Sequence, residues 1–476
     1  MATIELAGRR VGGDIGIGAG HLALFYRDDA GQEFILSAYT DNNLFVGDLY
    51  IQTHEGSAWV PRDLSDESLY SPALFDRVLL DFGGRDPEAV AAVIEQQAVA
   101  INELNLSYSA LTRNSNSVIG SLLDLVGIDV DEVLPNPPDV GWLGFVARNE
   151  LFEFAFGIDG SDGADLIRGR AFEQRFVGEG GDDTLIGGGG EDTLTGNAGD
   201  DMLNGGDGRD LSEFSGAQTS YTLTLSATEI TVTDRRAEGN GTDRLMGIEL
   251  LDFDTDLFGA PFDLDVFGRA VTLDQVQLES LIELYIACFN RAPDAVGLNF
   301  WATAHAVGLT LEEMAKEFTA QSEFIVLYPP GTSNSAFVAS VYDNVLGRLA
   351  DPDGSAFWTG LLDSGALDRD EFVLRVLEGA KAAPKPEMGQ AFVDQQNADR
   401  AYLETKTDIG AYFAVHKGMS DAGNGSAAMA LYDGSGTGVT AALTAIDGYY
   451  AEALDPARGE FLMPLVGVLD HPFDML

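Results

Sequence analysis

The chain has 476 residues, of which 45% are hydrophobic, so it is too long for a single core and most of it is able to fold. Its 27 basic residues against 77 acidic ones give a formal net charge of −50. Nucleic-acid binding depends on cations that neutralise phosphate, so this balance excludes a nucleic-acid partner and disfavours an anionic membrane surface. The acidity fits simple solubility, but charge of this size also repels itself, and a divalent cation would relieve the repulsion.

The number of cysteines and the N-terminal sequence indicate the cellular compartment in which the protein is expected to work. The single cysteine, Cys288, allows no disulfide within the chain, and we expect it to be a small buried residue on an apolar helix face. An exported protein without disulfides needs another source of stability, such as metal. The start of the chain has no apolar run of signal-peptide length, and no stretch approaches a transmembrane span. We therefore expect either a cytosolic protein or one exported without an N-terminal signal peptide.

The first 150 residues predict an α+β domain. Strands are expected over residues 20–28 and 32–40, and a helix over 86–104. A loop that enters another helix follows over 106–128. Clustered Pro and Gly over 133–144 predict a loop or linker near the end of this domain.

A histidine at the start of a strand and a serine at the start of a later helix suggest one catalytic arrangement. The pattern of His21 followed by Ser115 between Asn114 and Asn116 resembles a circularly permuted papain-like fold. That resemblance implies His21 as the base, Ser115 in the place of the nucleophilic cysteine, and Glu33 as the residue that orients the histidine. A helix N-terminus favours a thiolate, whereas a hydroxyl has a far higher pKa.

Three interpretations of this domain stay open. It is a non-catalytic descendant that binds a peptide or glycan, a serine-dependent amidase or peptidase, or an unrelated domain in which His21 is structural. A zinc site is disfavoured because the remaining histidines have no ligand spacing; they are His54, His305, His416 and His471.

A nine-residue repeat fills residues 160–213 without losing phase. Its six units read GSDGADLIR, GRAFEQRFV, GEGGDDTLI, GGGGEDTLT, GNAGDDMLN and GGDGRDLSE. The pattern is G-G-x-G-x-D-x-U-x, where U is a large apolar residue that would point inward from a short strand. An acidic, glycine-rich linker that binds nothing is the alternative, and the strict phase disfavours it.

These units resemble the RTX repeat of secreted Gram-negative proteins, a parallel β-roll that binds calcium. The resemblance implies Ca²⁺ between units n and n+2, coordinated by glycine-turn carbonyls and position-six aspartates. Gln174 and Phe172 depart from the pattern, so a site that uses this turn should be weak or absent, which leaves about three good sites. The implied ligands are Asp165, Asp183 and Asp201 on one side and Asp192 and Asp210 on the other.

Beyond the roll, expected over 157–213, residues 214–262 predict a β cap. Two alternating strands surround a turn at 226–228. The following GTDRLMGIELLDFDTDLF is similar to a phrase that trails RTX repeats, and we expect the segment to close the end of the roll.

A second repeat, helical, predicts a domain over 270–385. Residues 284–301 return 57 residues later as 341–358, each as a helix, an R-x-x-D-x-x-G turn and a helix with Phe-Trp, and Thr310 and Asp368 resemble helix N-caps. The pair resembles an uncharacterised helical family that accompanies RTX repeats. Either the arginines and tryptophans form a sugar or surface-polymer site, or the tryptophans are core and each arginine ties its turn to an aspartate. The four residues are Arg291, Arg348, Trp301 and Trp358.

Residues 386–476 predict a helical extension that ends in an apolar tail with scattered acidic residues. Such a tail is compatible with an uncleaved type I secretion signal. We therefore expect a secreted multidomain protein with an all-α C-terminal domain, whose β-roll folds on extracellular calcium. Its expected partners are calcium ions and a cell-surface glycan or protein. The competing hypothesis is a secreted hydrolase that uses His21 and Ser115, so whether the chain is an enzyme stays open.

Overall fold

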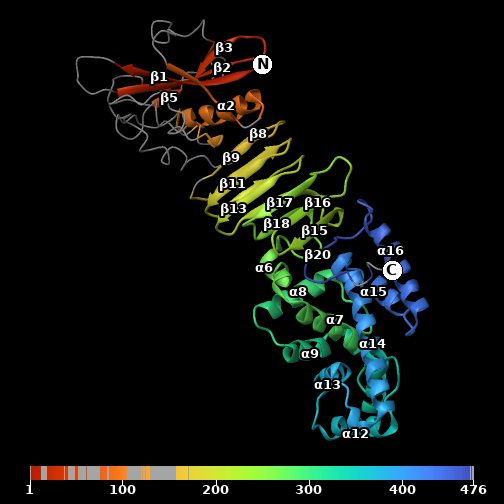
Figure 1. Ribbon diagram of the computed structural model, residues 1–476. Helices are drawn as coiled ribbons and strands as arrows, with labels where there is room; N and C mark the ends of the chain where they lie inside the picture. Colours follow the sequence, from red (N-terminus) through yellow and green to blue (C-terminus); the bar gives the residue numbers. More distant parts are fainter. Residues whose placement is uncertain are drawn as a thin grey trace. The chain divides into compact units, whose positions relative to one another are not determined.

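The computed structural model describes residues 2–11, 19–36, 38–40, 49–51, 60–61, 76–82, 85–103, 119–120, 122–123, 125–128, 157–169, 171–471 and 473. The chain divides into two compact units, whose helices and strands are labelled in Figure 1. The first comprises Met1–Ser215, Ala237–Asp254 and Ala260–Phe262. The second comprises Gly216–Arg236, Thr255–Gly259 and Asp263–Leu476.

An antiparallel sheet and a helix open the first unit. The sheet runs β6-β3-β2-β1-β7, and the side chains of Leu24 and Ile35 in the sheet and of Val90 in α2 are buried. The strand expected over 20–28 and the helix expected over 86–104 are confirmed, whereas the segment 32–40, expected as one strand, holds two strands, Glu33–Leu36 and Ala38–Thr40, that belong to different sheets. The elements are β1 (Thr3–Val11), β2 (Ala19–Arg27), β3 (Glu33–Leu36), β4 (Ala38–Thr40), β5 (Leu49–Ile51), β6 (Val60–Pro61), β7 (Asp76–Leu79) and α2 (Pro87–Glu103).

The nonapeptide repeats form two parallel sheets, and successive strands alternate between them. Leu185 pairs with Leu203 in one sheet and Phe176 with Leu194 in the other, so partners lie two repeat units apart. These four side chains are fully buried between the sheets, as the nine-residue period predicts. One sheet holds β9 (Leu166–Arg168), β11 (Thr184–Gly189) and β13 (Met202–Asp207), and the other holds β8 (Gly157–Ser161), β10 (Arg175–Glu179), β12 (Thr193–Thr195) and β14 (Leu211–Ala217).

Residues 214–262, which were expected to form one β cap, are divided between the two units. Strand β17 (Thr242–Met246) pairs in parallel with β13, and β18 (Leu250–Thr255) lies beside β14, so both extend the sheets of the roll. The hairpin of β15 (Tyr221–Ser226) and β16 (Ile230–Asp234) has the predicted antiparallel pairing but belongs to the second unit. We use "roll" below for residues 157–215 together with 237–254.

The helical part of the second unit repeats a three-helix motif. In both halves an aspartate caps the second helix: Asp294 accepts a hydrogen bond from the N–H of Gly297, and Asp351 from that of Gly354. The 57-residue repeat therefore reproduces the same turn twice. The first half holds α7 (Gln275–Phe289), α8 (Ala295–Ala306) and α9 (Leu311–Ala320), then α10 (Ser322–Leu327); the second holds α11 (Asn334–Leu346), α12 (Pro352–Ser364) and α13 (Arg369–Lys381). The expected N-caps are also present, as Thr310 of α9 and Asp368 of α13.

A long helix connects the two halves. In α14 (Gln390–Ala411), the Nζ of Lys406 donates to the Oδ1 of Asn290, which ends α7, and to the carbonyl of Asn344 in α11. Shorter elements surround this core: β19 (Phe262–Asp263), α6 (Leu264–Phe267), α15 (Ala422–Met429), α16 (Gly436–Ala453) and β20 (Leu465–Val466).

The apolar tail expected as part of a helical extension includes a strand. β20 pairs in parallel with β15, and the N–H of Leu223 donates to the carbonyl of Leu462. Phe461, Leu462, Met463 and Leu465 are buried, so this stretch is part of the core of the second unit. Within the part of the chain that the structure describes, no helix is both long and apolar enough to cross a membrane.

Candidate calcium-binding site

A ladder of aspartates runs along each side of the roll. In each ladder, the main-chain N–H at position six donates to the Oδ1 of the residue two units later, over 2.7 to 2.8 Å. One ladder therefore joins Asp165, Asp183 and Asp201, and the other joins Gln174, Asp192 and Asp210. The structure thus groups the five predicted ligands as the sequence analysis did.

The second carboxylate oxygen distinguishes the members. The Oδ2 atoms of Asp183, Asp192, Asp201 and Asp210 are buried and have no hydrogen-bond partner among the described residues. Asp165 differs, because its Oδ2 accepts bonds from both the N–H and the Oγ of Ser161. Buried polar oxygens without a donor are costly, so four of the five aspartates have an oxygen that is free to bind a cation.

The glycines explain where these oxygens point. A Cβ built on Gly178 would collide with the Oδ2 of Asp183 and come within 2.8 Å of the carbonyl oxygen of Gly196. Carboxylate and carbonyl oxygens therefore converge over each such glycine, in space that a side chain would fill. Calcium accepts both kinds of oxygen in flexible geometry, so the donor set fits this metal.

Main-chain oxygens must supply part of the shell. In the described part of the chain, no three Asp, Glu, His or Cys side chains come together as a metal cluster. A cation bound at Asp183 would thus take one carboxylate from the ladder and further oxygens from the glycine turns.

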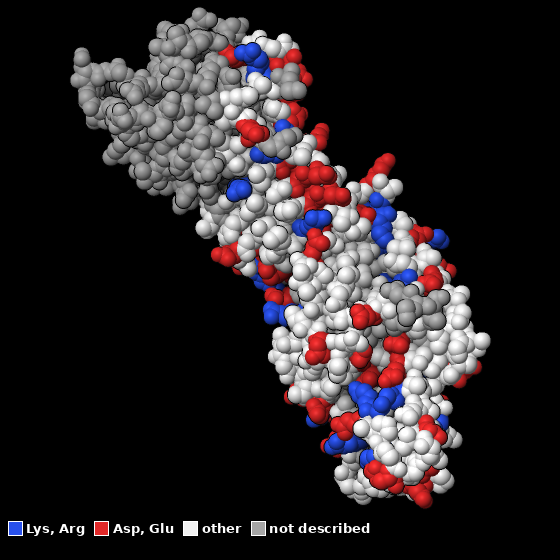
Figure 2. Space-filling view, viewed as in Figure 1, with Lys and Arg blue, Asp and Glu red and all other residues white. Residues whose placement is uncertain are grey.

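Burial makes the ladder electrostatically unfavourable without a cation. Desolvation raises the pKa of Asp183 to about 8 and that of Asp192 to about 7, and it also raises the pKa values of Asp165, Asp201 and Asp210. Acidic side chains gather in groups on the face drawn in Figure 2. A divalent cation would neutralise the buried carboxylates in place of protons.

The second repeat unit departs from the pattern as the sequence shows. Gln174 keeps its place in the ladder, and its N–H donates to the Oδ1 of Asp192 over 2.8 Å. Its Oε1 lies above Gly169, where the other units have a carboxylate oxygen. This turn therefore offers a neutral oxygen instead of a charged one.

Two residues that were not among the predicted ligands, Asp243 and Glu249, continue the ladders. The N–H of Asp201 donates to the Oδ1 of Asp243, and that of Asp210 donates to the Oε2 of Glu249. A signal was present, because Gly241, Asp243 and Leu245 keep the G-x-D-x-U spacing of the repeat.

The structure does not describe both of the expected catalytic residues, His21 and Ser115. His21 lies near the start of β2, opposite Arg9 of β1, whereas Ser115 lies outside the described residues, so their pairing stays a prediction. The orienting role expected for Glu33 is wrong. Glu33 pairs with Arg27 in register and by a 3.2 Å ion pair, six residues or about 20 Å along the strand from His21.

The paired arginines of the helical region bind acidic side chains. Arg291 contacts Glu323 at 2.6 Å and Asp294 at 3.4 Å, whereas Arg348 forms a two-pronged pair with Asp399 at 2.7 and 2.6 Å. Only the first arginine thus has the expected ion pair with its own turn. Both are engaged within the fold, which disfavours the sugar-site interpretation.

The equivalent tryptophans pack against aromatic rings. Trp301 lies 5.1 Å from the ring of Phe318, and Trp358 lies 5.4 Å from that of Phe372. The Nε1 of Trp358 also donates to the hydroxyl of Tyr342. Both tryptophans are half-buried, so the core interpretation is favoured.

Cys288 is fully buried, as predicted, and burial raises the pKa of its thiol. This places it with the inert structural cysteines.

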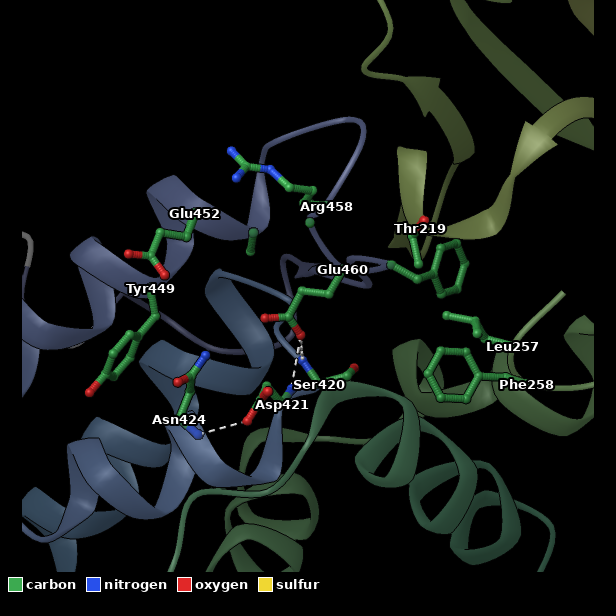
Figure 3. Close-up of a pocket in the computed structure, with 13 residues that line it drawn as sticks. Thr219, Leu257, Phe258, Ser420, Asp421, Asn424, Tyr449, Glu452, Arg458 and Glu460 are labelled. Atoms are coloured by element: carbon green, nitrogen blue, oxygen red, sulfur yellow. Dashed lines mark hydrogen bonds between the residues drawn. The ribbon is translucent and has the colours of Figure 1, made fainter. Parts of the chain in front are cut away.

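A pocket of about 390 Å³ lies within the second unit (Figure 3). Two of its acidic side chains bind the surrounding main chain: the Oε2 of Glu460 accepts hydrogen bonds from the N–H groups of Ser420 and Asp421, and Asp421 caps α15. The lining residues are Thr219, Leu257, Phe258, Ser420, Asp421, Asn424, Tyr449, Glu452, Ala453, Arg458, Gly459, Glu460 and Phe461.

Comparison with known proteins identifies two families. The RTX calcium-binding nonapeptide repeat (4 copies) matches residues 177–211, and the domain of unknown function DUF4214 matches residues 315–383. No curated protein matches the chain. A solved structure, the extracellular lipase LipA from Serratia marcescens, is 23% identical over 22% of this chain and 16% of its own length, with a TM-score of 0.11, too low to carry a structural argument. The RTX nonapeptide repeat family binds calcium, and this chain contains those repeats together with a DUF4214 domain.

Proposed function

We propose that this protein is a secreted calcium-binding protein whose roll folds when it meets extracellular calcium, and that the folded chain serves a surface or matrix interaction. The observation that carries the proposal is the set of four buried aspartate Oδ2 atoms that have no hydrogen-bond donor within the described part of the chain. They belong to repeats of a calcium-binding family, and RTX repeat proteins are typically secreted.

The difference between extracellular and cytosolic calcium concentrations supports an extracellular location. Extracellular calcium modules bind in roughly the 10⁻⁴ to 10⁻³ M range, well above cytosolic concentrations. At low calcium, the buried carboxylates would have to hold protons or repel one another, so the roll would be unstable. Outside the cell, the free energy of calcium binding becomes folding free energy.

Export through a C-terminal signal is part of the proposal. Residues up to Val466 belong to the strand pairing of β20, so removal of residues 467–476 spares this element. The shortened chain should accumulate inside a host that secretes the full chain. Normal secretion of the shortened chain would exclude these residues as an essential signal.

The test of calcium-driven folding is circular dichroism during a calcium titration from zero to about 10 mM, which spans the range of extracellular modules. A cooperative gain of β signal near millimolar calcium is expected, with little response to magnesium, which prefers a rigid octahedral shell. A flat titration would contradict the proposal.

A further inference from the structure

The two aspartate ladders continue beyond the contiguous repeats. Inside the repeats, ladder partners are 18 residues apart, as for Asp192 and Asp210. The next steps join residues that are far apart in the sequence: Asp210 to Glu249 over 39 residues, and Asp201 to Asp243 over 42 residues. The chain leaves the roll after Ser215 and returns at Ala237, and residues 216–236 between these points belong to the second unit.

The returning segment reproduces the glycine turn of a repeat. A Cβ built on Gly187 would meet the Oδ2 of Asp192 and the carbonyl oxygen of Gly205. A Cβ built on Gly205 would meet the Oδ2 of Asp210 and the carbonyl oxygen of Gly247 in the same way. Gly247 therefore takes the place that the first glycine of a contiguous unit would take.

The carboxylate of Asp210 has one oxygen that could bind a cation. Asp210 is 0% exposed, and its Oδ2 has no hydrogen-bond partner among the described residues. Its Oδ1 already accepts the N–H of Asp192, which fixes the orientation of the carboxylate. The Oδ2 and the carbonyl oxygen of Gly247 thus lie close together over Gly205, and no described donor satisfies the Oδ2, an arrangement that a cation stabilises.

We propose that a calcium ion binds between the Oδ2 of Asp210 and the carbonyl oxygen of Gly247, with Glu249 as a nearby second carboxylate. The site rests on the calcium binding proposed above and adds a position that the contiguous repeats, matched over 177–211, cannot complete alone. The ion acts as a latch, because it joins Asp210, the residue before β14, to the segment that returns after residues 216–236. Closing such a long loop costs conformational entropy, which the bound ion offsets.

The test compares Asp210→Asn with wild type and with Asp207→Asn, an exposed neighbour on β13. Equilibrium dialysis at saturating calcium counts the ions bound by each full-length chain. Asp210→Asn is expected to lose one ion while Asp207→Asn retains all. Asp210→Asn with the wild-type count would overturn the latch but leave calcium binding intact, whereas a wild type that binds no calcium would overturn both proposals.

Hydrogen exchange tests the closure itself. Calcium should slow amide exchange over residues 242–249 in wild type, and in Asp210→Asn this protection should be lost while that of 184–189 stays. Should Asp210→Asn fail to fold, Glu249→Gln keeps an oxygen for the N–H of Asp210 but removes the second charge. It should raise the calcium concentration needed to protect 242–249. If the protection of residues 242–249 does not depend on calcium in wild type and in the variant, the latch is refuted.

Discussion

The main-chain N–H of Asp192 donates to the Oδ1 of Asp210 over 2.7 Å, while the Oδ2 of Asp210 is buried and finds no donor among the residues that the structure describes. One carboxylate thus has two functions. One oxygen holds the register between repeat units, and the other is available to a cation. The repeat therefore joins the folding of the roll directly to calcium binding.

Replacing Asp192 by alanine should weaken calcium-driven folding more than replacing Gln174. Both residues hold the ladder, but only Asp192 offers a charged oxygen. We expect the calcium midpoint of Asp192→Ala to rise by about tenfold, or ~1.4 kcal/mol, in a circular dichroism titration. Equal midpoints for the two variants would contradict the ligand assignment.

Restoring the consensus carboxylate should strengthen the second turn. The Oε1 of Gln174 already lies over Gly169, near the carbonyl oxygen of Gly187. Gln174→Asp should therefore lower the calcium midpoint, because a neutral ligand becomes a charged one. Calorimetric titration of the variant beside wild type measures the change, and an unchanged midpoint would show that this turn binds no cation.

A methyl group on Gly178 should disrupt the roll. It would collide with the Oδ2 of Asp183, in the space proposed for calcium, at a cost of about 1–3 kcal/mol for overpacking. The matched control is Gly360→Ala in α12, where nothing lies within 4 Å and alanine should stabilise the helix by up to about 1 kcal/mol. Thermal unfolding in saturating calcium separates the two, and similar melting temperatures would be evidence against a closely packed turn.

Lys406 should make the helical region more stable at alkaline pH. Burial lowers the pKa of its ammonium to about 8, below the ordinary 10.5, so the folded state binds fewer protons than the unfolded state between these values. The free energy of unfolding should therefore rise with pH from about 8 towards about 10. Urea unfolding can be monitored through the helical circular dichroism signal at several pH values. The free energy of unfolding should rise with pH in wild type and in the exposed control Lys316→Met, but not in Lys406→Met.

Breaking the pair between Arg348 and Asp399 should destabilise the second helical half. Arg348→Met leaves the mostly buried carboxylate of Asp399 without its cation, at a cost of roughly 2 kcal/mol. The double variant with Asp399→Leu should recover part of that loss, because no unpaired charge remains. If Arg348→Met unfolds at the wild-type urea concentration, the pair has no structural role.

The nine-residue period by itself determined the parallel sheets, the inward leucines and the grouping of the aspartates. Each of these follows from a local rule repeated in phase. The 57-residue period likewise predicted two equivalent helical motifs with capping aspartates. Tertiary structure decided the rest: the carbonyl of Gly247 lies beside the Oδ2 of Asp210, and Arg348 binds Asp399.

The physical reason for this division is the range of the interactions. Periodicity specifies which face of an element is apolar and which turn needs glycine, because those preferences depend on residues a few positions apart. Which residues continue the ladders beyond the contiguous repeats depends on chain segments that meet only when the molecule folds. The sequence alone therefore determined the calcium-binding repeat, and the tertiary structure decided which residues continue the ladders.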